Sequence, residues 1–389
     1  MRRYFAGLSP NTFLLAFASL FADTSTEMLY PILPVFLTET LGASGSVVGI
    51  VEGMAVAVQY IWQGVAGWLA DKFQRPKPMA LAGYIVAALS KPLIGLSSSW
   101  HGVLGARSLD RFATGTRSAP RDAMVAASAN AEHRGKAFGL EGIGDNLGAC
   151  LGPLIAIALV SGFGFHLRSI FFLAVIPGLL AAAMILFLRE QSTRVSAKAT
   201  LDMNVGRFPA AYWRYLAVTA VFGVGNSSNS FLILRTKDLG LSLTTTVLIY
   251  AFFNFVAAVA SYPAGYLSDR LGRKRILLGA FAVFLVVYLG FSSVSNITLI
   301  AALFILYGVF EAAYRAVGKA LATDFVPADL RASGVGWFSA TVGLSGLIAS
   351  LVGGQLWTHV GPASTFLFGA VMSGVGIIAA SILISKKTA

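Results

Sequence analysis

Charged side chains interrupt several long apolar stretches of this 389-residue chain, and their spacing could support proton transfer. Asp23 and Glu27 lie four residues apart in the first stretch, so they share one face of a helix. Burial between apolar helices favours the neutral form of a carboxylate, whereas a nearby arginine favours the charged form. A site that gains and loses a solute beside such a group can therefore take up and release a proton. We expect Asp23 or Glu27 to carry that proton.

A second set of charges lies in the fourth apolar stretch. One helical face there carries Asp110, Thr114, Arg117 and Arg121. Arg111 lies one step around the helix, and we expect it to bias the proton affinity of the carboxylates, including Asp110. An ionisable residue at bilayer depth costs at least about 2.5–3.5 kcal/mol, so each is a candidate functional residue. The alternative for each is a structural ion pair inside a helix bundle.

The elements that must position these residues are membrane helices. Hydrophobic residues make up 56% of the chain and charged residues 12%, against about 25% charged in soluble domains. A bilayer accepts this much apolar surface, whereas a soluble core does not. About twelve apolar stretches have helical length: 12–37, 46–66, 79–97, 102–125, 137–160, 168–188, 213–234, 243–264, 276–294, 297–320, 332–357 and 364–385. We predict an all-α integral membrane protein whose first stretch is retained as a helix.

The basic residues predict the orientation of the chain. If the N-terminus is cytoplasmic, most of the 29 lysines and arginines fall in cytoplasmic segments, and Arg168, Arg235 and Lys237 fall outside. Positive charge accumulates on the cytoplasmic side of membrane proteins. We therefore expect the protein to lie in the inner membrane of the cell, with both of its termini in the cytoplasm. The net charge of +12 then reflects topology and not nucleic-acid binding.

A basic turn occurs twice in the chain. The run from Gly67 to Lys77 reads Gly-Trp-Leu-Ala-Asp-Lys-Phe-Gln-Arg-Pro-Lys, and the run from Gly265 begins Gly-Tyr-Leu-Ser-Asp-Arg-Leu-Gly-Arg-Lys, 198 residues later. A repeat of this kind predicts two six-helix halves of the same orientation with a cavity between them. We place the halves at 1–188 and 213–389, joined by a cytoplasmic linker at 189–212.

This turn resembles the signature of the major facilitator superfamily, and the chain resembles its twelve-helix, drug/proton antiporter-like bacterial members. The resemblance implies a charge network that locks the outward-open state. By position, its members here are Asp71, Arg75, Asp122, Asp269 and Arg273. The first copy departs from the signature at Gln74, where glycine is usual, and at Pro76.

Two further elements resemble those of the family's proton antiporters. The Arg111-x-x-x-Gly115 element is similar to one in their fourth helix, and the run from Gly148 through Gly152-Pro153 is similar to one in their fifth, with Ala156 in place of its last glycine. Glycines at this spacing give a flat face for close helix packing, and the proline is expected to bend the helix. Ordinary small-residue packing is the alternative interpretation.

The second half carries fewer membrane charges than the first, which places proton coupling mainly in the first half. We expect the second half to supply aromatic and amide contacts. The candidates for the substrate cavity are Tyr30, Arg117, Asp145, Asn226, Asn254, Glu311 and Arg315.

The leading functional prediction is proton-coupled export of a small organic solute by alternating access, as in drug or metabolite efflux. The alternative is a proton-coupled uptake symporter. An enzyme is disfavoured because no phosphate-binding loop, HExxH pair or Gly-x-Ser-x-Gly motif occurs, and a sensor because the loops are short. The lone Cys150 and four scattered histidines suggest no metal site, and we expect no cofactor. The expected partners are a small-molecule substrate, protons and the lipid bilayer, with the protein as a monomer.

Overall fold

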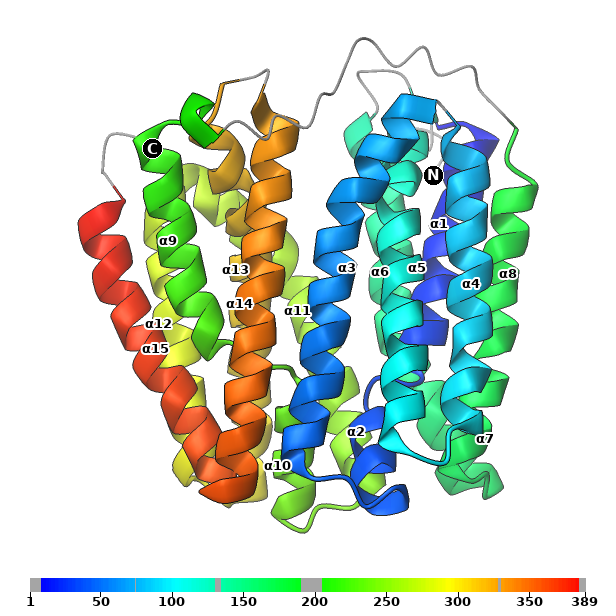
Figure 1. Cartoon of the computed structure of the whole chain (residues 1–389), viewed down its shortest axis with the longest axis vertical. Helices are drawn as coiled ribbons and strands as arrows, with labels where there is room; N and C mark the ends of the chain where they lie inside the picture. Colours follow the sequence, from blue (N-terminus) through cyan, green and yellow to red (C-terminus); the bar gives the residue numbers. More distant parts are fainter. Residues whose placement is uncertain (1–7, 74, 130–133, 190–204, 328–329, 385–389) are drawn as a thin grey trace. The chain divides into compact units, whose positions relative to one another are not determined.

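The computed structural model describes residues 8–73, 75–129, 134–189, 205–327 and 330–384, and the regular secondary structure of these ranges is helical (Figure 1). Ten segments of this part of the chain are long and apolar enough to cross a bilayer. The other two of the twelve predicted helices are α1 (Pro10–Glu27) and α5 (Trp100–Ala127), which carry the polar and charged residues of interest. The predicted all-α membrane architecture is confirmed.

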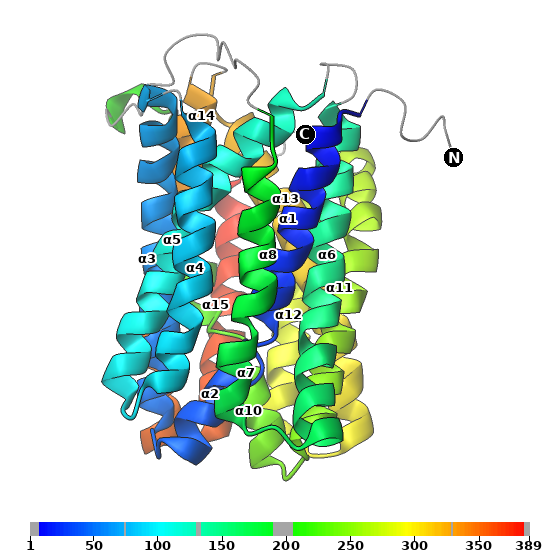
Figure 2. The ribbon, with the colours of Figure 1, turned by 90° about the vertical axis from the view of Figure 1, so that its right-hand side faces the viewer.

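The first compact unit comprises Met1–Phe36 and Val58–Ala199. Besides α1, α5 and the later part of α3 (Gly45–Phe73), its helices are α2 (Leu33–Val35), α4 (Pro76–Leu96), α6 (Arg134–Ile157), α7 (Leu167–Leu173) and α8 (Val175–Leu186). Within it α1 packs against both α6 and α8, while α4 packs against α5 and α8 (Figure 2). The charged face of α5 is therefore enclosed by other helices of the same unit.

The second compact unit comprises Leu37–Ala57 and Thr200–Ala389. Besides the first part of α3, its helices are α9 (Ala210–Gly225), α10 (Ser230–Asp238), α11 (Leu243–Leu271), α12 (Arg273–Ser293), α13 (Ile297–Asp324), α14 (Arg331–His359) and α15 (Pro362–Leu383). Its core is rich in aromatic rings, with Phe222 stacked on Phe281 at 3.9 Å and Phe284 on Tyr288 at 3.8 Å between centroids. The boundaries expected for the halves stay a prediction, and residues 190–204 of the expected linker lie outside the described residues.

One expectation about the first helix is wrong. The stretch 12–37 is not one helix, because α1 ends at Glu27 and a turn covers residues 28–32 before α2 begins. Pro31 and Pro34 explain the break, since proline lacks the N–H that a helix interior needs and clashes with the preceding turn. Tyr30 therefore lies in this turn and Pro34 in α2, and neither belongs to the helix of Asp23 and Glu27.

The same interruption recurs in the seventh predicted stretch. Here α9 ends at Gly225, which lies 198 residues after Glu27, and α10 begins at Ser230. Asn226 provides the C-cap of α9. The break is thus part of the internal repeat, although the acidic residue is not.

The repeated basic turn is shorter than the sequence indicates. The helices before it continue to Phe73 and Leu271 and so run through Gly67 and Gly265, with which the two runs begin. In the second copy Gly272 closes α11 with φ +90°, a conformation that favours glycine. Gln74 and the side chains of Asp71 and Asp269 lie outside the described residues.

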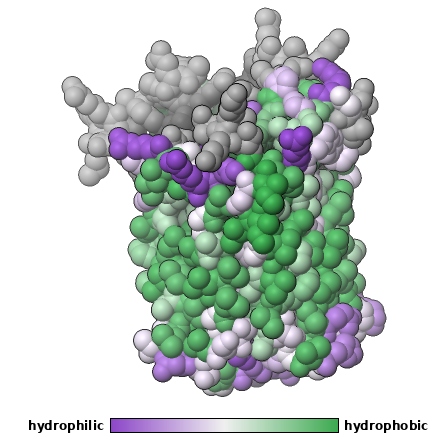
Figure 3. All heavy atoms as spheres, turned by 90° about the vertical axis from the view of Figure 1, so that its left-hand side faces the viewer, coloured by the Kyte–Doolittle hydropathy of each residue, from purple (hydrophilic) through white to green (hydrophobic). Residues whose placement is uncertain are grey.

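The surface of the second unit has the distribution of a membrane protein. Figure 3 views the side on which α9 and α15 are drawn in Figure 1, and a broad band of apolar side chains covers the middle of this face. Hydrophilic residues gather towards its two ends. This pattern matches the apolar core and polar boundaries of a bilayer.

Candidate functional site

The first cluster of the candidate site surrounds Asp110 on α5, whose side chain is 1% exposed. Its Oδ1 lies 3.4 Å from the Lys91 Nζ of α4, and its Oδ2 lies 3.2 Å from Arg107 Nη1. The Nε of Arg111 lies 3.3 Å from the same Oδ2. Three cations therefore contact one buried carboxylate, and these contacts fix the Asp110 side chain in place.

The two ends of the Arg111-x-x-x-Gly115 element both contact Gln59 of α3. Arg111 Nη1 donates to Gln59 Oε1 at 3.3 Å. A Cβ atom on Gly115 would lie 2.8 Å from the backbone oxygen of Gln59. Glycine at this position is thus required for the close approach that brings the arginine to its amide partner.

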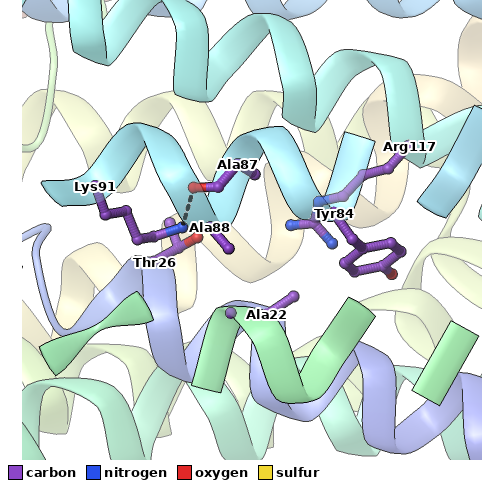
Figure 4. A pocket seen from close by; sticks show the side chains of 8 residues that line it. Ala22, Thr26, Tyr84, Ala87, Ala88, Lys91 and Arg117 are labelled. Atoms are coloured by element: carbon purple, nitrogen blue, oxygen red, sulfur yellow. Dashed lines mark hydrogen bonds between the residues drawn. The ribbon is translucent and has the colours of Figure 1, made fainter. Parts of the chain in front are cut away.

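The second cluster joins α5 to α1 and α4. Arg117 is 6% exposed, and its guanidinium lies over the Tyr84 ring at 4.5 Å. Its Nη2 lies 4.0 Å from Asp23 Oδ1, and the Asp23 side chain is 30% exposed. Arg117 and Lys91 both line a small cavity in this unit, shown in Figure 4. A half-open carboxylate at this distance is held less firmly than Asp110.

The third cluster is rich in acids and surrounds Arg121. Arg121 Nη1 lies 2.9 Å from Glu141 Oε1 and 3.5 Å from Asp145 Oδ1 of α6, while Nη2 lies 3.1 Å from Asp122 Oδ1. Ser19 of α1 donates to Glu141 at 2.7 Å. Charge is therefore segregated along α5, with cations around Asp110 and carboxylates around Arg121.

The glycines of α6 face α1 at the level of the two candidate proton carriers. A Cβ atom on Gly148 would lie 2.6 Å from the Leu20 carbonyl oxygen and 2.8 Å from the Asp23 Cβ. One on Gly152, which precedes Pro153, would lie 2.8 Å from the Glu27 Cβ. Side chains at these positions would push α1 away, so the glycine face fixes where both carboxylates stand.

The residues expected in the charge network are placed as follows. Asp122 pairs with Arg121, and Arg75 is exposed directly before α4. Arg273 at the start of α12 pairs with Asp324 at the end of α13, 2.8 Å apart. This pair joins two consecutive helices of the second unit, and the lock expected of Arg273 stays a prediction.

The remaining cavity candidates are distributed over both units. The Arg107 guanidinium lies over the Tyr30 ring at 5.7 Å in the first unit. In the second unit Glu311 is partly buried and Arg315 exposed on α13, and Asn254 is partly buried on α11. The expectation that candidates of both units line one cavity stays a prediction.

Several residues of these clusters were not among the predicted site residues. Lys91, Arg107 and Glu141 complete the clusters of the first unit, and their charge inside apolar stretches is the signal in the sequence that could have identified them. Asp324 could not be found from the repeat, since the offset of 198 from Asp122 leads to Ala320. No group of three or more potential metal ligands occurs within the described ranges.

Comparison with known proteins agrees with this architecture. The family model described as Major Facilitator Superfamily matches residues 15–234 and 215–389. An uncharacterized MFS-type transporter of Methanocaldococcus jannaschii is 33% identical over 372 residues, covering 94% of this chain and 93% of that protein.

Two relatives have more specific names. A probable 4-methylmuconolactone transporter of Cupriavidus pinatubonensis is 28% identical and covers 91% of this chain and 85% of its own length. The multidrug resistance protein MdtG of Enterobacter lignolyticus is 29% identical over 66% of this chain and 64% of its own length. The family and these relatives are transporters and not enzymes. With a matching family model over nearly its whole length and helices that can span a bilayer, this chain belongs to the Major Facilitator Superfamily and is a multi-pass membrane transporter.

Proposed function

We propose that this transporter exports a small organic solute in exchange for protons, with both termini in the cytoplasm and the protein in the inner membrane. Asp23 and Glu27 carry the proton in this proposal, and Arg117 and Arg111 bias its affinity. Asp110 holds Arg107 and Arg111 in place.

The observation that carries the proposal is the partial exposure of Asp23 and its long contact with Arg117. Its carboxylate is partly exposed and lies 4.0 Å from a buried arginine, at the outer limit of an ion pair. A proton or a solute that reaches Asp23 can therefore weaken this pair at little cost, because the two ions are not locked in a short hydrogen bond. Competition between the proton and the solute for the Asp23 carboxylate is the simplest physical basis of exchange.

The direction of transport rests on the two antiporter-like elements and on one relative. The glycine face of α6 holds Asp23 and Glu27 directly, so the element that resembles the antiporter signature contacts the proposed proton carriers. A relative named as a multidrug resistance protein supports export of an organic solute.

Proton-coupled uptake of a small metabolite is the second candidate. The relative named as a probable 4-methylmuconolactone transporter, which matches nearly the whole chain, supports a small metabolite as the solute. The two candidates share the same proton carriers and differ in the direction of solute movement.

Inside-out vesicles with an acidic lumen distinguish the two candidates. An exporter accumulates solute in the lumen while protons leave, whereas a symporter moves solute outwards with the protons. We would follow ethidium and 4-methylmuconolactone by uptake and lumenal pH by a fluorescent dye. Accumulation driven by the pH gradient is expected for at least one probe, and accumulation that ignores the gradient would contradict proton coupling.

Asp23→Asn and Glu27→Gln test the proton carriers in the same vesicles. The double variant is expected to lose gradient-driven accumulation while solute exchange without a gradient persists. Glu39→Gln is the matched control, since Glu39 is a 53% exposed carboxylate paired with Lys237 outside these clusters. Gradient-driven transport that survives in the double variant would remove Asp23 and Glu27 from the mechanism.

A further inference from the structure

Arg117 is held by two consecutive residues of α4, Gly83 and Tyr84. A Cβ atom on Gly83 would lie 2.8 Å from the Arg117 Cβ and 2.8 Å from the Ala113 carbonyl oxygen, so glycine is needed for α4 to approach α5 here. This approach brings Tyr84, which is 2% exposed, to the Arg117 guanidinium, whose carbon lies 4.5 Å from the ring centroid. Figure 4 shows the guanidinium and the ring next to each other at one end of the small cavity, with Lys91 at the other.

The aromatic ring stabilises this arginine without a hydrogen bond. The Nε of Arg117 is buried and has no hydrogen-bond partner, and its Nη2 lies 4.0 Å from Asp23 Oδ1, which is beyond the length of a hydrogen bond. The negative face of an aromatic ring attracts a guanidinium, and the attraction is strongest where water is excluded. The Tyr84 hydroxyl is also buried without a hydrogen-bond partner, so the ring and not the hydroxyl is the part of this side chain that holds Arg117.

Other charged groups surround the Asp23–Arg117 pair, and they come from four helices. These groups are Glu27 of α1, Lys91 of α4, Asp110 and Arg121 of α5, and Asp145 of α6. Helix α8 also packs against α1, but it contains no charged residue. Arg121 is already paired with Glu141 and Asp145. Arg117 is therefore the cation whose distance from Asp23 depends on what else holds its guanidinium.

We propose that Tyr84 is a positioning residue, whose ring holds the Arg117 guanidinium away from Asp23 and so leaves the Asp23 carboxylate open to a proton. Without the attraction of the ring, the guanidinium closes on Asp23 and forms a short ion pair, which stabilises the charged carboxylate against protonation. This role rests on the proposed function, in which Asp23 carries the proton. It explains how a carboxylate beside a buried arginine exchanges its proton during transport.

Fluorinated phenylalanine at position 84 of the purified full-length protein tests the proposal. Fluorine withdraws negative charge from the ring face and changes the shape of the ring little, so the fold is kept. Infrared difference spectroscopy follows protonated Asp23 by its carboxylic C=O band, which Asp23→Asn identifies by removing it. Tyr84→Phe should leave the pH of half-protonation unchanged, and one, two and three fluorine atoms should lower it stepwise, by about 0.5–1 pH unit in all. A midpoint that stays or rises, or an Asp23 that gives no such band, would overturn the proposal.

Two further variants separate this role from ordinary packing. Tyr84→Leu removes the ring and should lower the midpoint as the trifluorinated ring does. Phe171→Leu is the control, since it removes another buried ring of the same unit, which packs on Phe36 at 5.0 Å between centroids. It should lower Tm and leave the midpoint in place, and an equal shift in Phe171→Leu would overturn the proposal. The infrared titration needs no solute and no gradient, so it tests Tyr84 even if the vesicle experiments remove Asp23 from the transport mechanism.

Discussion

At the scale of single residues, Arg121 compensates the charge of the carboxylates in the third cluster. It contacts Glu141, Asp145 and Asp122, and the Glu141 side chain is 8% exposed. Removing one partner of a buried ion pair leaves the other charge without compensation, which costs about 3–5 kcal/mol. We expect Arg121→Leu to lower the free energy of unfolding by this amount, measured by denaturant or thermal unfolding in micelles.

The prediction for Arg121 has two internal checks. Adding Glu141→Gln to Arg121→Leu should recover part of the lost stability, because the stranded charge is then neutral. Lys237→Met is the control, since its partner Glu39 is 53% exposed and exposed pairs contribute about 0–1 kcal/mol. A similar loss in Arg121→Leu and Lys237→Met would show that the acidic cluster does not depend on Arg121.

At the scale of elements, the contact between α1 and α6 depends on glycine. A Cβ atom on Gly148 would lie 2.6 Å from a backbone oxygen of α1, which cannot turn away as a flexible side chain can. Overpacking of this kind costs about 1–3 kcal/mol. We expect Gly148→Ala to lower Tm and to reduce gradient-driven transport, because α1 carries Asp23 and Glu27.

The same helix offers a matched control for Gly148. A Cβ atom on Gly142 meets no atom within 4 Å. Alanine is the better helix former by about 0.5–1 kcal/mol, so Gly142→Ala should be neutral or stabilising. Equal effects of the two substitutions would mean that helix propensity, and not the contact with α1, decides the result.

At the scale of the whole molecule, the proposed orientation follows from the positive charge at one end of the helices. Cys150 is the only cysteine, so Cys150→Ser provides a background for single cysteines. Ser98 lies just beyond the end of α4 and Pro78 in its first turn, and both are exposed. We expect a membrane-impermeant thiol reagent to label Ser98→Cys in intact cells, and Pro78→Cys only after permeabilisation. The opposite pattern would invert the topology.

The sequence alone determined the architecture of this transporter, and the physical reason is the bilayer. Backbone groups in lipid must be paired within helices, so apolar stretches of about twenty residues translate directly into spans. The duplicated turn, which begins at Gly67 and at Gly265, indicated the internal repeat. The sequence also contained the signal for the break after Glu27, namely Pro31 and Pro34. The apolar character of residues 12–37 is continuous across these prolines, so hydrophobicity alone predicts one helix there.

Only the tertiary structure decided which charges meet. Helical spacing placed Asp110, Arg117 and Arg121 on one face of α5. It could not show that Lys91 of α4 contacts Asp110, or that Glu141 of α6 contacts Arg121. The same spacing could not show that Arg117 faces a cavity shared with Lys91. Ion pairing depends on distances of a few ångströms between helices distant in sequence, and those distances are set by the packing of residues such as Gly148 and Gly115.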